Sequence, residues 1–287
     1  MQQPDGIIKE IQEEITTTST FDDSEVSKIS FVLHLADNAL ILAQQNTKWC
    51  GHGPVLEQDI ALTNISLDLL GQSRNLYQYA ASLINKSNQR KAIDFSPATE
   101  DSLAYLRDEK DFMNCLLVEQ PNGNWGQTIL RQFLFSHYQY LLYQQLQFSK
   151  DETLAAIAVK SLKEITYHIR WSSEWVIRLG DGTEESHRKM VNALGELWAF
   201  TGEFFMPADY EIEAIIGTDL RSLKQPWFKI VREVLEEATL WTTTLADTEQ
   251  QDNSMQSGGK NGVHSEYMGY ILAELQYLQR VYPGSEW

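Results

Sequence analysis

The sequence lacks the features that mark several large classes of protein. It has only two cysteines, Cys50 and Cys115, and neither lies in a CxxC or Cys/His spacing of a metal site. Two free thiols fit a reducing compartment, so we expect a cytoplasmic protein. We find no apolar run of the roughly 18 residues that a membrane span needs. Residues 1–23 also lack the apolar stretch of a signal peptide.

Positive charge is scarce as well. The chain has 23 Lys and Arg residues against 40 Asp and Glu residues, which gives a formal net charge of −17. A surface of this sign repels phosphate backbones and anionic lipid, so we expect no nucleic-acid partner and no membrane partner. The sequence contains no GxGxxG, P-loop or GxSxG motif, and nucleotide-binding and serine-hydrolase chemistry therefore have no support.

Apolar residues at helical spacing are abundant. Hydrophobic residues make up 43% of the chain, and no stretch alternates apolar and polar residues long enough to require a strand. The pattern predicts long helices between Ser24 and Gly51 and over 54–83, 125–148 and 152–179. Four such helices with one longer connection between the second and third predict an all-α, ferritin-like four-helix bundle with additional helices.

Shorter segments fill the rest of the chain. We expect a polar N-terminal leader over 1–23 and a single helical domain over 24–287. Thr183 is a helix-capping residue with acids behind it, and it predicts the start of another helix. The further expected elements are a shorter helix from Glu100 to Glu119, less regular helices over 219–249, a glycine-rich loop at 258–262 and a last helix near 264–281.

The sequence offers few ligands for the di-iron centre that a ferritin-like bundle often holds. Such a centre takes carboxylates from two helices and a Glu-x-x-His pair from each of two others, because residues three apart share a helix face. Of the six histidines, only His187 follows an acid by three positions, in Glu184-Glu185-Ser186-His187. Acids favour the first turn of a helix on electrostatic grounds, and we therefore interpret this stretch as surface capping.

Four polar residues are nevertheless expected at the bundle centre. Asp68–Gly71 has glycine where a histidine ligand would stand, and Glu164–Tyr167 has tyrosine there. Buried polar groups need hydrogen-bond partners, so we predict a polar cluster in place of a metal. Its expected members, joined directly or through water, are Asp37, Asp68, Glu164 and His168. Residual metal binding is the alternative that stays open.

Several longer stretches closely resemble one protein family. They are Leu35–Asn38, Trp49–Pro54 with Leu56, Glu57 and Asp59, Asn64–Gln72, Arg107–Glu109, Leu117–Asn124, Lys163–Glu164 with Tyr167–Arg170, Gly258–Lys260, His264–Glu266 and Leu272–Arg280, followed by Pro283, Gly284 and Trp287. In this order, over roughly residues 30–287, they resemble the PaaC family, the C subunits of bacterial phenylacetyl-CoA epoxidases. The resemblance implies a structural, non-catalytic subunit of a monooxygenase complex in aerobic phenylacetate catabolism. It implies that the catalytic A subunit is the partner and holds the di-iron centre, and that this chain has no cofactor of its own.

Two functions from different classes remain at this point: a scaffold subunit, or a free-standing ferritin-like di-iron oxygenase or metal-binding protein. The ligand count favours the scaffold. A scaffold should expose an apolar face to its partner, and the isolated chain should self-associate, for example as a homodimer. The expected face lies on the third long helix (Trp125, Phe133, Tyr138, Tyr140, Leu141 and Tyr143) or on the tail (Tyr267, Tyr270, Leu275, Tyr277 and Leu278).

Two smaller sites complete the predictions. A substrate or partner contact is expected at Asp111, Phe112, Met113 and Asn114, where aromatic, thioether and polar groups are mixed; a half-buried helix face is the alternative. At the glycine-flanked corner, His52 is expected at the end of the bundle, either in a plain interhelical turn or in a functional contact.

Overall fold

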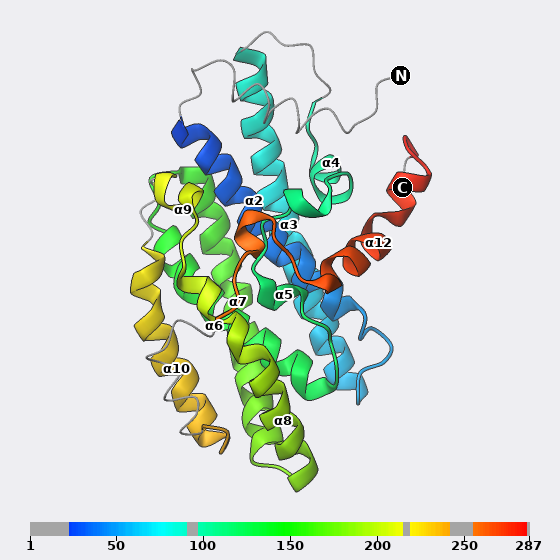
Figure 1. Ribbon diagram of the computed structural model, residues 1–287, viewed down its shortest axis with the longest axis vertical. Helices are drawn as coiled ribbons and strands as arrows, with labels where there is room; N and C mark the ends of the chain where they lie inside the picture. The colour runs from blue at the N-terminus through cyan, green and yellow to red at the C-terminus, as the bar shows by residue number, and fades with distance from the viewer. Residues whose placement is uncertain (1–22, 91–96, 215–218, 242–254, 286–287) are drawn as a thin grey trace.

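The protein is described by a computed structural model over residues 23–90, 97–214, 219–241 and 255–285, and every regular element in these ranges is helical (Figure 1). The four longest helices are α2 (Asp23–Thr47), α3 (Leu56–Arg90), α6 (Trp125–Leu146) and α7 (Glu152–Gly180). Helix α2 packs along α3, α6 packs along α7, and α3 also contacts α7. The predicted all-α class is confirmed, and the four long helices contact one another in the spatial order α2, α3, α7, α6.

Shorter helices surround this framework. They are α4 (Glu100–Tyr105), α5 (Leu116–Glu119), α8 (Glu184–Leu197), α9 (Asp209–Glu213), α10 (Lys224–Glu237) and α12 (Glu266–Val281). Short 3-10 helices are η1 (Glu109–Asp111), η2 (Trp198–Phe200), η3 (Gly202–Phe205), η4 (Leu220–Leu223) and η6 (Gly259–Asn261). Helices α8 and α10 pack on α6, and α9 packs on α2. Helix α12 lies against α2, α4 and α5, and its C-terminal half projects from the body in Figure 1.

Local capping explains where several helices begin. Asn124, Asp151 and Thr183 each accept a hydrogen bond from the backbone N–H three residues ahead, which satisfies one of the free donors at the starts of α6, α7 and α8. These starts agree with the predicted ones within a residue or two. Helix α3 continues to Arg90, beyond the predicted end near Leu83. The leader up to residue 22 and the end of the 219–249 segment lie outside the described residues.

The predicted helix from Glu100 to Glu119 is wrong. The structure has α4, η1 and α5 there, with residues 112–115 in between as non-helical backbone. The amides of this stretch donate to side chains from elsewhere: Met113 N to Asp37, Cys115 N to Asn38, and Leu116 N to Glu203. A helix would use those amides internally, so the three acceptors stabilise the irregular path instead.

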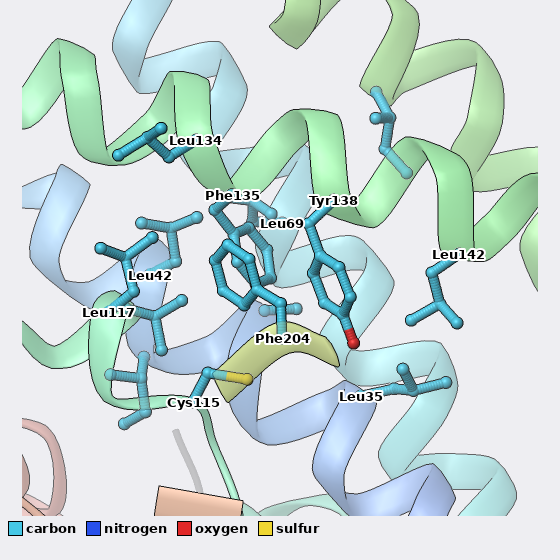
Figure 2. Packing of buried hydrophobic residues seen from close by; sticks show 14 of the residues in the cluster. Leu35, Leu42, Leu69, Cys115, Leu117, Leu134, Phe135, Tyr138, Leu142 and Phe204 are labelled. Atoms are coloured by element: carbon cyan, nitrogen blue, oxygen red, sulfur yellow. The ribbon is translucent and has the colours of Figure 1, made fainter. Parts of the chain in front are cut away.

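The hydrophobic core lies around α2, α3 and α6, with η3 closing one side. Figure 2 shows side chains of α2, α3 and α6 surrounding Cys115, Leu117 and Phe204, which come from irregular or short segments. The Phe204 ring stacks on Tyr138 with centroids 4.4 Å apart. Phe133, Tyr138 and Tyr143 are all buried, so the prediction that α6 exposes an apolar face is wrong. An additional layer, formed by α8, α10 and η3, covers the surface that a bare bundle would leave open.

Helix α2 corrects the expectation that no apolar run is long enough to span a membrane. Its stretch Ser24–Thr47 passes that test by length and hydropathy. Most of the stretch is buried inside the protein, with Phe31, Val32 and Ile41 fully covered. Its hydropathy is therefore accounted for by its place at the centre of the fold.

Candidate functional site

The bundle centre carries a chain of polar side chains from α3, α6 and α7. His168 Nε2 lies 3.1 Å from Asp68 Oδ2. Gln72 Nε2 donates to Glu164 Oε2 at 2.9 Å, and Gln139 Nε2 donates to Gln72 Oε1 at 2.9 Å. We call these five residues the bundle-centre cluster. Three of the four residues that the sequence placed at the bundle centre lie in it, in two hydrogen-bonded groups.

The bundle-centre cluster is incompletely hydrogen-bonded and partly open to solvent. The His168 side chain is fully buried, whereas the Asp68 side chain is 35% exposed. Gln139 Oε1, His168 Nδ1 and the nearby Tyr143 hydroxyl are buried without a hydrogen-bond partner among the described residues. Burial raises the pKa of Tyr143, so its phenol stays neutral at physiological pH. The cluster thus contains two acids: Asp68 lies beside His168, and Glu164 accepts a hydrogen bond from the Gln72 amide.

Asp37 belongs to a second cluster, which corrects the expectation that it joins the other three. Its carboxylate accepts hydrogen bonds from both terminal nitrogens of Arg107, from the Tyr77 hydroxyl at 2.5 Å, and from Met113 N at 2.8 Å. The Arg107 guanidinium also lies 4.1 Å from the Phe112 ring centroid. We call Asp37, Tyr77 and Arg107 the crossover cluster, because Arg107 comes from the connection between α3 and α6.

Electrostatics fix the charge states in the crossover cluster. Burial alone lowers the pKa of Arg107, but the adjacent Asp37 carboxylate outweighs burial, and the net pKa is raised. Burial, together with the Asp37 carboxylate, raises the pKa of Tyr77 well above its usual value. The cluster is therefore a buried ion pair with a neutral phenol donating to the carboxylate. Asp37 therefore binds the opposite charge of Arg107 instead of joining the other three predicted residues.

A third group of buried charges holds the chain that leads into α12. His264 Nδ1 lies 3.0 Å from Glu119 Oε2, and His264 Nε2 lies 3.0 Å from the Phe112 carbonyl oxygen. Both neighbours are acceptors, so both ring nitrogens donate and the imidazole is protonated. Burial lowers the pKa of His264, but the Glu119 carboxylate offsets that effect, and the net pKa is raised. Ser265 N donates to the second Glu119 oxygen at 2.7 Å.

Glu203, Glu211 and Lys260 complete this group. We call Glu119, Glu203, Glu211, Lys260 and His264 the tail cluster. Lys260 Nζ lies 3.0 Å from Glu211 Oε2 and also donates to carbonyl oxygens of η3 and its C-cap. Glu203 accepts from Gly258 N at 2.8 Å and from Leu116 N at 2.6 Å. The tail cluster ties residues 258–265 to α5, η3 and α9 and so sets the direction of α12. Sequence reasoning missed these pairs, because Glu119 and His264 are 145 positions apart.

The predicted contact at Asp111–Asn114 lies mostly inside the protein. Phe112 and Asn114 are fully buried, and Asn114 Nδ2 donates to Glu119 Oε2 at 3.2 Å. Asp111 and Met113 are partly exposed. The contact with substrate or partner stays a prediction, and it now rests on these two outer side chains.

The glycine-flanked corner forms a sharp turn between α2 and α3. Gly51 has a φ of +80°, a conformation that favours glycine, and Gly53 N donates to Asp59 Oδ2 at 3.0 Å. Trp49 lies at the bundle end and donates to Thr128 Oγ1 at 2.9 Å. His52 is exposed, and its Nδ1 lies 3.2 Å from the Cys50 carbonyl oxygen. A functional contact of His52 stays a prediction.

These residues do not fit a di-iron centre. In the described ranges, no group of three or more His, Cys, Asp or Glu side chains is arranged to hold a metal ion. Glu164 is engaged by the Gln72 amide, and Asp37 is engaged by Arg107. His187, the one histidine with an acid three positions before it, donates instead to the Gly180 carbonyl oxygen at 2.7 Å, at the end of α7. The donor sets of these clusters therefore fall short of the carboxylates and histidines that two irons require.

The fold and these clusters define an all-helical bundle protein whose buried charges join segments of the chain to one another. The phenylacetic acid catabolic protein family matches residues 10–287. A relative from Escherichia coli (strain K12), the C subunit of 1,2-phenylacetyl-CoA epoxidase, is 44% identical over 261 residues, which cover 90% of this chain and 98% of the relative. The chain therefore belongs to the phenylacetic acid catabolic protein family, and the predicted resemblance is confirmed.

Proposed function

We propose that this chain is the C subunit of a phenylacetyl-CoA epoxidase and acts as its structural, non-catalytic component in aerobic phenylacetate catabolism. The observation that carries the proposal is the 44% identity to an epoxidase C subunit over nearly the whole length of both proteins. The donor sets of the three buried clusters support the non-catalytic role, because their acids are engaged by Arg107, by amide groups, by His168 or by the Lys and His of the tail cluster.

The partner in this proposal is the catalytic A subunit, which carries the di-iron centre. Helix α12 supports a role in assembly, because it carries aromatic side chains on its exposed side as well as apolar side chains on its buried side. Met268, Ile271 and Leu272 are buried against the body, while Tyr270 and Tyr277 are 73% and 59% exposed on the other side. Exposed aromatic side chains on one helix face are common at protein interfaces. Self-association of the isolated chain through such a surface is part of the same proposal.

Co-expression with the A subunit tests the proposal directly. We expect the two chains to elute together in size-exclusion chromatography and the A subunit to have higher epoxidase activity when this chain is present. A monodisperse monomer that neither binds the A subunit nor changes its activity would contradict the proposed function.

Metal analysis tests the non-catalytic part separately. For the aerobically purified chain we expect an iron content far below one ion per chain. Near-stoichiometric iron, with spectroscopic signs of a coupled pair, would favour the alternative of a free-standing ferritin-like di-iron protein. Asp68→Asn provides the control, since it should leave the trace iron content unchanged if no site includes this acid.

A further inference from the structure

Helices α3 and α7 pack against each other, and each has a row of exposed residues on its outer side. The two helices are antiparallel neighbours: Trp171 Nε1 donates to Gln58 Oε1, and Gln72 donates to Glu164, so contacts advance along one helix as they recede along the other. On the solvent side, Leu56, Ile60, Leu67 and Gly71 follow one side of α3. Lys160, Lys163, Tyr167 and Arg170 follow the matching side of α7. We call these eight residues the α3–α7 face.

The α3 half of this face is an exposed apolar stripe. Leu56, Ile60 and Leu67 are 71%, 51% and 59% exposed, and their spacings of four and seven place them on one side of the helix. The opposite side of α3 already supplies the core through Ile65 and Leu69, both fully buried. Gly71 continues the exposed side with open space around its Cα. Three aligned apolar side chains beside a glycine form a ridge and a gap against which another helix can pack.

The α7 half of the face is basic, although the chain as a whole has a net charge of −17. Lys160, Lys163 and Arg170 are exposed, and within the part of the chain that the structure describes none of them forms an ion pair. Arg170 lies over the Tyr167 ring, 5.8 Å from its centroid. By contrast, Lys189 is paired with Glu185 on α8 at 2.6 Å. The basic stripe therefore lacks the acid partners found elsewhere on the surface.

We propose that the α3–α7 face docks an amphipathic helix of the A subunit that carries an apolar stripe flanked by acids. The apolar stripe would lie on Leu56, Ile60 and Leu67, and the acids would face Lys160, Lys163 and Arg170. Charge complementarity identifies this occupant, since opposite potentials across an interface set the register and the association rate. The inference rests on the proposed function, because it names a surface, separate from α12, that binds the A subunit.

A second copy of the chain fits the same face less well. In a twofold dimer the same patch of each chain meets the other. The basic stripe of one chain then lies against either the basic stripe or the apolar stripe of the second chain. Neither arrangement gives Lys160, Lys163 and Arg170 an acid partner. An acidic partner helix satisfies both halves of the face together.

Charge reversal on α7 tests the proposal. We expect Lys160→Glu/Lys163→Glu/Arg170→Glu to weaken binding to the A subunit by about tenfold or more at low salt and to reduce the salt dependence of the Kd. The matched control is Arg188→Glu/Arg221→Glu/Lys229→Glu, which makes the same charge change at exposed positions on other elements. We expect the control to bind within about twofold of the wild type. Circular dichroism and thermal unfolding of each variant check the fold.

Leu67→Asp tests the apolar half independently and should also weaken binding by about tenfold or more, because it places a charge in a desolvated contact. If both α3–α7 variants bind the A subunit as the wild type does, or if Tyr277→Ser on α12 alone abolishes binding, the inference is wrong and the proposed function stands. If light scattering shows a dimer that the α7 reversal dissociates, the occupant is a second copy and the inference is also wrong. If the wild-type chain does not bind the A subunit at all, the proposed function itself fails.

Discussion

Asp37 and Asp68 are both acids of the four-helix framework that the sequence assigns to the bundle centre, and the structure gives them opposite environments. Asp37 is fully buried and accepts hydrogen bonds from Arg107, Tyr77 and a backbone amide. Asp68 is 35% exposed, and its Oδ2 lies 3.1 Å from His168 Nε2. The first acid belongs to a closed ion pair and the second to a cluster that borders on solvent.

The difference shows which parts of this fold depend on buried charges for stability. The crossover cluster holds the segment between α4 and α5, where Met113 N donates to Asp37, and removing one member of the cluster leaves an uncompensated charge in the interior. The bundle-centre cluster joins helices that their apolar faces already hold together. We therefore expect charge changes to matter greatly in the crossover cluster, less in the tail cluster and least at the bundle centre.

The largest effect is expected for Asp37→Asn. The substitution keeps the shape of the side chain but leaves the buried Arg107 guanidinium without its counter-charge, which should lower the free energy of unfolding by about 3–5 kcal/mol. Urea denaturation followed by circular dichroism measures the change. A loss below about 1 kcal/mol would place Asp37 on a level with Asp68 and remove the contrast between the two clusters.

An intermediate effect is expected for His264→Gln in the tail cluster. Loss of the charge-assisted hydrogen bond to Glu119 should reduce the free energy of unfolding by about 1.5–3 kcal/mol near pH 6. Because the folded pKa of His264 is raised above 6.5, its contribution is fully present below that pH and is lost as the pH rises through the folded pKa. The difference between wild type and variant should therefore shrink towards alkaline pH.

Two other buried histidines, His34 and His137, have lowered pKa values, so their contributions to stability change with pH in the opposite direction to that of His264. They serve as an internal reference. Burial lowers the pKa of His34, and it lowers the pKa of His137 to about 4, so their neutral forms favour folding above pH 6.5 and that contribution is lost on acidification. Both residues are present in the wild type and in His264→Gln, so their effect cancels in the difference. A difference that grows with pH would contradict a protonated His264.

A smaller effect is expected for Asp68→Asn. The Asp68 side chain is partly solvated, and water can replace much of what its carboxylate provides to His168, so the loss should be about 1 kcal/mol or less. The same denaturation assay applies, with Asp37→Asn as the matched comparison on α2. A loss of about 3 kcal/mol or more would mean that the bundle-centre cluster is as strongly coupled as the crossover cluster.

Local signals in the sequence were sufficient for most of the helices. Asn124, Asp151 and Thr183 act within one turn of their own position, and the helices behind them begin where those residues predict. The helical class followed from periodicity alone. The break inside 100–119 could not be predicted in the same way, because its amides are satisfied by Asp37 and Glu203 from distant parts of the chain.

The candidate site could be predicted only in part for the same reason. Glu164 and His168 share a helix face, which sequence spacing reveals, and both lie in the bundle-centre cluster. The partner of Asp37 is Arg107, which is 70 positions away in an irregular segment, so no spacing rule connects them. The apolar residues of α6 indicated a partner surface, but only the tertiary structure reveals that further helices of the same chain cover it.

The smallest effect is expected where two neutral amides are removed together. Gln72 and Gln139 are hydrogen-bonded to each other, and Gln139 Oε1 is buried with no partner in the described ranges. Gln72→Met alone leaves the Gln139 amide unpaired and should cost about 1–3 kcal/mol. Gln72→Met/Gln139→Met removes both groups and keeps their volume, so the double variant should lie within about 1 kcal/mol of the wild type. Glu164, which loses the Gln72 donor in both variants, is partly exposed and can be solvated. Urea denaturation of the three proteins measures these differences in the free energy of unfolding. A double variant less stable than Gln72→Met would mean that the amides of the bundle centre hold the helices together, as the charges of the crossover cluster hold the irregular segment.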